Sequence, residues 1–327
     1  MTCGICRAIL AAATVALIAL PASSAVAKSS YKEPAITAPT ARLAESLVCP
    51  DKITRSGFQP LMLVSGTFGT GAEFYMMVSA ALKVTKRPIC YVNFPYRTTG
   101  DIQIGAQYLV SGIRRMAAMY GKPIGVFGVS QGGLLPRWAL TYWPSLRAKV
   151  SDVIAVAGTQ HGTTLGLGTC SAMNPCQAAG WQQRARSNLL KAINAEPDES
   201  VGPTSWTTVR SATDEVVQPQ TGPHPTSSLK GAANILIQDV CLGRNVSHVG
   251  LALDSVTFAA AEDALTYKGP ASVKRLPKDV CSKPLAPGLN AAPAGATDEW
   301  LGAFFTDLAP RLPAEPLVKR YALKRVP

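Results

Sequence analysis

The sequence predicts an α/β fold with a mostly parallel sheet that is covered by helices on both faces. Short apolar runs alternate with longer segments in which bulky apolar residues recur at helical spacing, as in parallel strands joined by crossover helices. Apolar residues make up 47% of the 327 residues, enough to bury one large core. A Gly-x-Ser-x-Gly sequence at residues 128–132 lies between one of these strands and the helix that follows it.

The predicted elements follow one another in a regular order. Strands are expected where a run is short and apolar, at residues 61–65, 88–93, 123–129, 153–157, 206–211 and 235–240. Helices are expected where apolar residues repeat at helical intervals, at residues 73–86, 102–120 and 131–146. The remaining segments are a long excursion at 158–203, a Pro/Ala/Gly-rich strap at 284–295 and a helix at 298–308 that opens with acidic residues.

The first 27 residues have the pattern of a secretory signal peptide. A single positive charge, Arg7, precedes an unbroken apolar stretch at residues 8–20, and small residues end at Ala25-Val26-Ala27. The apolar stretch is too short to span a bilayer, so a membrane anchor is the weaker alternative. We expect a secreted, extracellular protein, with the periplasm as the other possible location. Removal of Arg7 changes the formal charge from +12 to +11.

Residues 28–327 are expected to form a single domain that ends in the irregular strap and a basic tail. The tail carries Lys319, Arg320, Lys324 and Arg325, which we interpret as a solvated terminus. The net positive charge could attract anionic lipid surfaces or could serve solubility alone. No motif supports nucleic-acid binding, and we expect a monomer.

Six cysteines remain after removal of the signal peptide: Cys49, Cys90, Cys170, Cys176, Cys241 and Cys281. An even number in an exported protein predicts three disulfides, although the spacing leaves the connectivity open. A zinc site is the weaker alternative, because these six contain no Cys-x2-Cys pair and no histidine lies at ligand spacing from a cysteine pair. No metal or organic cofactor is expected.

The sequence Gly128-Val129-Ser130-Gln131-Gly132 predicts a nucleophile elbow, the sharp strand-to-helix turn of α/β-hydrolases. The turn is strained and leaves no room for side chains beside the nucleophile, which explains the two glycines. Ser130 is therefore the candidate nucleophile. The pentapeptide alone is modest evidence, so the assignment depends on a matching base and acid.

A serine nucleophile needs a histidine base and a carboxylate, which occur in this fold in the chain order Ser, acid, His. His161 precedes every later strand that could carry the acid, and His224 lies in a Gly-Pro-His-Pro turn. His248 follows the last predicted strand by a few residues and is the expected base. Asp214, after the strand at 206–211, is the expected acid. Glu215 is a weaker candidate for the acid, and Asp239, inside the next apolar run, competes with Asp214 for this role.

The negative oxygen that forms during acyl transfer needs preorganised N–H donors. The backbone N–H of Gln131, the residue after the serine, is one expected donor. The other is expected in the glycine-rich loop at residues 65–71, where Thr67 can offer its N–H and its hydroxyl. A phosphate-binding loop is the weaker alternative, since no Gly-Lys-Ser/Thr follows.

Three segments resemble the family of Candida antarctica lipase B: residues 61–67, residues 130–133 with the following 138–145 and, most specifically, the sequence around Asp214 at residues 211–220. The resemblance runs from about Cys49 to Cys281. It implies a secreted serine lipase with nucleophile Ser130, acid Asp214, base His248 and an oxyanion hole at Thr67 and Gln131. It also implies the disulfides Cys49–Cys90 and Cys241–Cys281, which leaves Cys170 and Cys176 to pair with each other.

Two departures from this family affect selectivity more than catalysis. Val129 stands where the resembled lipase has a tryptophan that lines the leaving-group side of the pocket. Residues 158–162 read Gly-Thr-Gln-His-Gly where that lipase has a Pro-Asp pair. Selectivity is therefore not expected to follow the relative.

We expect a carboxylic-ester hydrolase and favour a triacylglycerol lipase that acts on lipid or other ester substrates and contacts the lipid–water interface transiently. The alternatives that use the same triad are an acyltransferase and a polyester or short-chain esterase. A non-catalytic binding module would show a broken triad, which this sequence does not. The glycosylation sequon Asn245-Val246-Ser247 is expected to be unmodified, because it adjoins His248.

Overall fold

The computed structural model describes residue 1 and residues 32–164, 170–289 and 306–323, and the chain divides into two units, residues 1–32 and 33–327. The predicted signal peptide lies outside the described residues apart from Met1. So do the end of the predicted strap, most of the predicted helix at 298–308, and Lys324 and Arg325. No helix among the described residues is long and apolar enough to cross a membrane. The unit 33–327 is described below.

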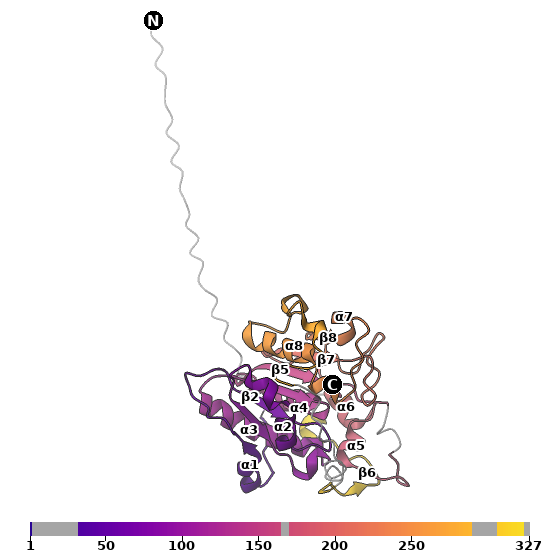
Figure 1. Cartoon of the computed structure of the whole chain (residues 1–327). Coiled ribbons are helices and arrows are strands. Elements are labelled where there is room, and N and C mark those ends of the chain that lie inside the picture. Colours follow the sequence, from indigo (N-terminus) through magenta and orange to yellow (C-terminus); the bar gives the residue numbers. More distant parts are fainter. Residues whose placement is uncertain (2–31, 165–169, 290–305, 324–327) are drawn as a thin grey trace. The chain divides into compact units, whose positions relative to one another are not determined.

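Within the described residues, seven strands form one sheet in the order β1-β3-β2-β4-β5-β7-β8, and all neighbours are parallel except β1 and β3. Their bounds are β1 Leu47–Val48, β2 Leu61–Val64, β3 Ile89–Val92, β4 Ile124–Val129, β5 Val150–Val156, β7 Ser205–Arg210 and β8 Ala233–Leu236. Figure 1 shows β2, β5, β7 and β8 across this sheet, and α8 packs against β5 and β7. The mostly parallel α/β sheet confirms the predicted fold class.

The described α-helices are α1 Thr40–Ser46, α2 Gly71–Lys83, α3 Ile102–Tyr120, α4 Gln131–Tyr142, α5 Ala178–Gln182, α6 Asn188–Asn194, α7 Ile237–Val240, α8 Ser255–Thr266 and α10 Arg320–Leu323. They cover both faces of the sheet, and β2 shows this division. Met62 and Val64 join the buried cluster under α3 and α4, whereas Leu61 and Leu63 join the cluster under α2 and α8. This alternation follows from the two-residue period of a strand.

Two predicted elements end four residues earlier in the structure than the sequence predicts. The strand expected at 235–240 ends at Leu236, and residues 237–240 form the short helix α7. The helix expected at 131–146 ends at Tyr142, because Pro144 two residues later starts a 3₁₀ turn.

Several of the described helices were not predicted, and α8 is the longest of them. α8 is alanine-rich and buried along most of its surface, so it lacks the polar stripe by which a surface helix is detected. It begins at the cap Asp254, whose side chain accepts a hydrogen bond from Val256 N at 2.8 Å.

The C-terminal segment (residues 306–323) contacts β6, α6 and α4. Its strand β9 (Arg311–Leu312) pairs with β6 (Cys176–Gln177) in a separate two-stranded sheet. The Glu315 carboxylate accepts hydrogen bonds from the first two backbone N–H groups of α6. Tyr321 packs against three aromatic rings of α4 and its end, Trp138, Tyr142 and Trp143.

Three disulfides hold the loops around the sheet: Cys49–Cys90, Cys170–Cys176 and Cys241–Cys281. These are the pairs that the family resemblance implies. Each bridge is expected to contribute about 2–4 kcal/mol by restricting the unfolded chain.

Candidate active site

Ser130 occupies a sharp turn between β4 and α4, with φ 57° and ψ −125°. Such a positive φ is rarely adopted by a residue with a side chain and marks local strain. Neither flanking glycine could carry a Cβ. A Cβ on Gly128 would lie 1.9 Å from the carbonyl oxygen of Gly132, and a Cβ on Gly132 would lie 2.1 Å from the carbonyl oxygen of Val64. The structure therefore has the geometry of the elbow that the pentapeptide predicts.

Asp214 and His248 form a buried pair at the same edge of the sheet. Nδ1 of His248 lies 2.9 Å from Oδ2 of Asp214, and the two residues are 8% and 1% exposed. The other carboxylate oxygen of Asp214 accepts hydrogen bonds from Val216 N and Val217 N, both at 2.8 Å. With Nδ1 donating to this fixed carboxylate, Nε2 of His248 is free to accept a proton.

The loops that carry Asp214 and His248 are tied together by two further side chains. The Thr213 hydroxyl donates to Val246 O at 3.0 Å and accepts from Val246 N at 2.9 Å. The Glu215 carboxylate accepts from the backbone N–H of His248 at 2.9 Å. Glu215, the weaker candidate for the acid, therefore binds the histidine through its backbone rather than its ring.

The loop at residues 65–70, here called the β2–α2 loop, lies directly against Ser130. A Cβ on Gly66 would lie 2.9 Å from Cβ of Ser130 and 3.6 Å from its Oγ. The Thr67 hydroxyl donates to Oε1 of Gln131 at 2.8 Å, which joins the two candidate oxyanion residues. Thr67 and Gln131 thus lie together beside the candidate nucleophile.

Gln183, which no sequence motif marks, forms hydrogen bonds to both of these residues. Its amide nitrogen lies 2.9 Å from the Thr67 hydroxyl and 3.1 Å from Oε1 of Gln131, and its own oxygen accepts from the Thr159 hydroxyl at 3.0 Å. Nothing local distinguishes Gln183 from Gln182, which instead binds the start of α3 through Asp101 and Ile102. The signal is purely tertiary.

The other candidates lie outside this arrangement. His161 bonds to Glu199 Oε1 at 3.2 Å and to the Thr226 carbonyl oxygen at 3.1 Å, and His224 is exposed in its turn. Asp239 is exposed on α7 rather than buried in a strand. No group of three or more His, Cys, Asp or Glu residues within the described ranges could hold a metal ion.

A second cluster of charges lies around His161. The hydrogen bond from His161, helped by the Lys230 backbone N–H and by the charge of Arg137, lowers the pKa of Glu199 to about 2. Arg137 is fully buried on α4, where its guanidinium donates to Asn194 and to the carbonyl oxygens of Gln160 and Ile193. Burial lowers the pKa of Arg137 to about 10, so it stays charged at neutral pH.

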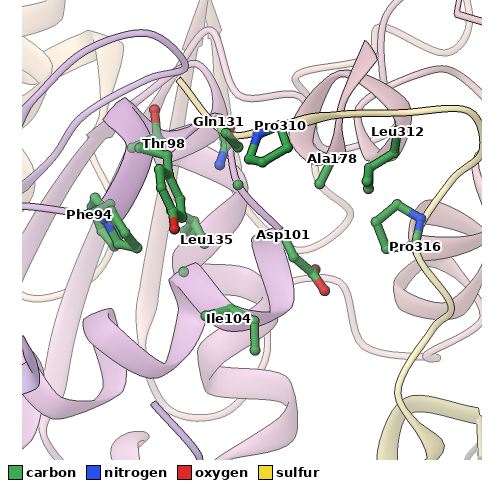
Figure 2. Close-up of a pocket in the computed structure, with 15 residues that line it drawn as sticks. Phe94, Thr98, Asp101, Ile104, Gln131, Leu135, Ala178, Pro310, Leu312 and Pro316 are labelled. Atoms are coloured by element: carbon green, nitrogen blue, oxygen red, sulfur yellow. The ribbon is translucent and has the colours of Figure 1, made fainter. Parts of the chain in front are cut away.

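A cavity of about 360 Å³ reaches Gln131 from the side of α3 (Figure 2). Most of its lining side chains are apolar, and they come from the 3₁₀ turn η1 (Pro95–Thr98), α3, α4 and the C-terminal segment: among them Phe94, Ile104, Leu135, Pro310 and Leu312. The cavity gives the site an apolar neighbourhood of the size of a small ligand.

The parallel sheet, the serine elbow after β4 and the Asp–His pair after β7 and β8 define an α/β-hydrolase. No family model matches the chain. Lipase B of Pseudozyma (Candida) antarctica is 33% identical over 245 residues, which cover 72% of this chain and 70% of that protein. The chain therefore belongs to the lipase B family and is a carboxylic-ester hydrolase.

Solved structures agree with this assignment. The crystal structure of Aspergillus fumigatus lipase B matches with a TM-score of 0.79 and 27% identity, covering 89% of this chain and 73% of that one. The propeptide form of the Bacillus licheniformis lipase BlEst2 matches with a TM-score of 0.54 and 16% identity, over 69% of this chain and 54% of that one. The second match supports the fold alone.

Substitution of Gly132 by alanine is expected to destabilise the protein by more than about 3 kcal/mol, because the new Cβ would displace the β2 backbone. Thermal melting of the purified variant measures this. Gly105→Ala in α3 is the matched control, since its Cβ would meet nothing closer than 3.7 Å and alanine favours a helix by about 1 kcal/mol. A Gly132→Ala variant that melts at the wild-type temperature would contradict the close contact.

Glu199→Gln is expected to destabilise the protein at pH 7, with an effect that fades on acidification. The folded pKa of Glu199, about 2, lies below its ordinary value of 4.5, so the stabilisation is complete above 4.5 and is lost as the pH falls toward 2. Urea midpoints at pH 7, 5, 4 and 3 measure the difference. Glu45→Gln, at a 70% exposed side chain, is the control. A difference that stays constant from pH 7 to pH 3 would show that Glu199 is not an ionised partner.

Proposed function

We propose that the protein is a secreted serine lipase that hydrolyses carboxylic esters of lipids, triacylglycerols among them, through an acyl-enzyme. Ser130 is the nucleophile, His248 the base and Asp214 the acid. The observation that carries this assignment is the buried 2.9 Å pair of His248 and Asp214, fixed by two backbone N–H groups, at the sheet edge where β4 ends in the strained Ser130.

Each partner has a defined part in the chemistry. Oγ of Ser130 attacks the ester carbonyl carbon while Nε2 of His248 takes the hydroxyl proton, and Asp214 stabilises the resulting imidazolium. Collapse of the tetrahedral intermediate expels the alcohol, which takes the proton from His248. A water molecule then attacks the acyl-serine in the same way and releases the acid.

The N–H groups of Thr67 and Gln131 stabilise the negative oxygen of both intermediates. Their proximity to Ser130, and the polar support from Gln183, favour this role. The Thr67 hydroxyl, which donates to Gln131 here, can rotate to become a third donor.

Secretion and contact with a lipid surface are supported by separate features. The signal-peptide pattern of residues 1–27 and the three disulfides favour an oxidising, extracellular location. On the loop that carries His248, Leu242 and Val249 are 98% and 54% exposed. Exposed apolar side chains beside a catalytic base suit transient contact with a lipid–water interface.

Ser130→Ala and His248→Ala are each expected to lower ester hydrolysis on the order of 10⁴-fold or more without unfolding the protein. Asp214→Asn is expected to be severely impaired as well, because the histidine loses its orienting carboxylate. Hydrolysis of a p-nitrophenyl ester, normalised to folded protein by circular dichroism, measures these losses. Asp239→Asn, at an exposed carboxylate, is the control that keeps activity. A Ser130 or His248 variant with a tenth of wild-type turnover would rule out the triad.

Val129→Trp is expected to impair turnover of bulky secondary-alcohol esters more than that of ethyl esters. Val129 is half-buried and directly precedes the nucleophile. Three side chains large enough to fill space near it each form a hydrogen bond to another group: Gln160 to Gly133 O, His161 to Glu199 and Trp181 to Leu312 O. We propose that the space beside Val129 is left open to substrate.

A change in the fit of an alcohol group to an apolar pocket corresponds to about 1–3 kcal/mol. The expected discrimination between bulky and ethyl esters is therefore tens of fold. The measurement is kcat/KM for both ester classes, with Val84→Trp at an exposed position of the α2 terminus as the control. An equal fall for bulky and small alcohols would reject the idea that Val129 opens a leaving-group pocket.

A further inference from the structure

Three consecutive residues without a glycine among them adopt left-handed backbone angles before α3. Tyr96, Arg97 and Thr98 have φ values of 55°, 50° and 59°. Left-handed geometry is unfavourable for residues with a Cβ, so such a run persists only where the surroundings hold it. We call residues 96–98 the left-handed turn.

Two side chains of this turn bind the β2–α2 loop and the start of the helix that follows the loop. Nε of Arg97 donates to Phe68 O at 2.9 Å, and the Thr98 hydroxyl donates to Gly66 O. An Nη of Arg97 lies 2.7 Å from both carboxylate oxygens of Glu73, and this ion pair is largely buried, with side chains 9% and 15% exposed.

Glu73 connects the left-handed turn to Thr70, at the end of the β2–α2 loop. It is the third residue of α2, and its carboxylate accepts from the backbone N–H of Thr70 at 2.9 Å while the Thr70 hydroxyl accepts from Glu73 N at 3.1 Å. One carboxylate therefore caps the helix and anchors the left-handed turn. The loop is fixed at Gly66, Phe68 and Thr70, on both sides of Thr67.

These contacts also set the direction of an N–H group. A trans peptide unit is planar, so the C=O of Gly66 and the N–H of Thr67 point in opposite directions. The Thr98 hydroxyl engages the Gly66 carbonyl oxygen, which turns the Thr67 N–H away from the left-handed turn. Phe68, whose carbonyl oxygen Arg97 binds, has a left-handed φ of 67° itself, so the loop departs from ordinary backbone geometry where it is held.

We propose that Arg97 and Thr98 are positioning residues that hold the β2–α2 loop so that the Thr67 N–H faces the oxyanion formed at Ser130. The inference rests on the proposed function, because it assigns the purpose of the loop from the reaction at Ser130. Neither residue touches the reacting atoms. They act through the two carbonyl oxygens that flank Thr67.

The test compares an oxoester with the thionoester of the same acid and alcohol. Sulfur accepts hydrogen bonds weakly, so a thionoester gains little from oxyanion donors, and a misplaced donor therefore slows the oxoester selectively. Arg97→Met is expected to lower kcat for the oxoester about 10- to 100-fold, since small misplacements near a reacting group have effects of this size. The KM for the oxoester and the thionoester rate are expected to change less than about 3-fold.

Further variants keep the test decisive if Arg97→Met does not fold. Arg97→Lys retains the charge beside Glu73 but loses the planar fork that also reaches Phe68 O, and is expected to show a smaller loss of the same selectivity. Thr98→Val removes the hydroxyl at nearly constant shape and is expected to lose oxoester activity selectively, whereas Thr98→Ser is expected to restore it. Titration with a phosphonate ester normalises all rates to competent sites.

Arg275→Met is the matched control. Arg275 makes a comparable two-bond ion pair with Asp263 of α8, at 2.7 Å for each bond, and α8 supplies no residue of the site. Both substrates are expected to be turned over at about the wild-type rate. Arg97 and Thr98 variants that slow the oxoester and the thionoester equally, or slow neither, would overturn the inference.

Replacement of the Thr67 backbone N–H by an ester oxygen, with the α-hydroxy acid of threonine incorporated at this position, separates the two levels of the assignment. If this backbone ester slows the oxoester selectively while the Arg97 and Thr98 variants remain at the wild-type rate, the inference alone is wrong. If the backbone ester leaves the oxoester rate unchanged, the assignment of the Thr67 N–H to the oxyanion hole in the proposed function is wrong and this inference falls with it. The triad is tested independently by Ser130→Ala.

Discussion

The strand β4, the helix α4 and the end of strand β2 approach one another so closely that only backbone fits between them. Gly128 and Gly132 create this contact, because a Cβ on either would lie about 2 Å from a carbonyl oxygen. Two consequences follow for the site. Ser130 is forced into its left-handed angle above the sheet, and the loop after β2 is brought against its side chain. The remaining site residues are arranged around this fixed point.

Around the fixed point, neutral amide and hydroxyl groups join several of the site residues. Gln183 joins Thr67 to Gln131, and Gln160 donates to Gly133 O within the first turn of α4. Such groups hold their hydrogen bonds at every pH at which the protein is folded, because they do not titrate.

The sequence predicted those parts of the molecule that depend on local pattern or chain order. The bounds of α3 were predicted to the residue, since its apolar spacing is a local signal. Asp214 and His248 followed from the order Ser, acid, His, and the structure brings them to 2.9 Å. By contrast, the strand expected at 235–240 turns into a helix midway, since an apolar run alone does not define where pairing ends.

Contacts between segments that are distant in the chain could not be predicted from the sequence. The role of Gln183 depends on a contact between the end of α5 and the β2–α2 loop, which are more than a hundred residues apart in the chain. Glu215 was the weaker candidate for the acid in the sequence, and in the structure it binds the backbone N–H of His248. The left-handed angles of Tyr96, Arg97 and Thr98 could not be predicted, because none of these residues is the glycine or asparagine that usually marks such geometry.

The buried ion pair of Arg97 and Glu73 is difficult to explain by stability alone. Removing two charges from water costs several kcal/mol, and apolar side chains of similar volume often stabilise a fold at least as well. Here the pair also sits on backbone that is itself strained. What a guanidinium provides and an apolar side chain cannot is several donors in one rigid plane, which bind a carboxylate and a carbonyl oxygen at once. Such a group fixes the direction of a loop as well as its position, and direction is what a hydrogen-bond donor to a short-lived negative charge requires.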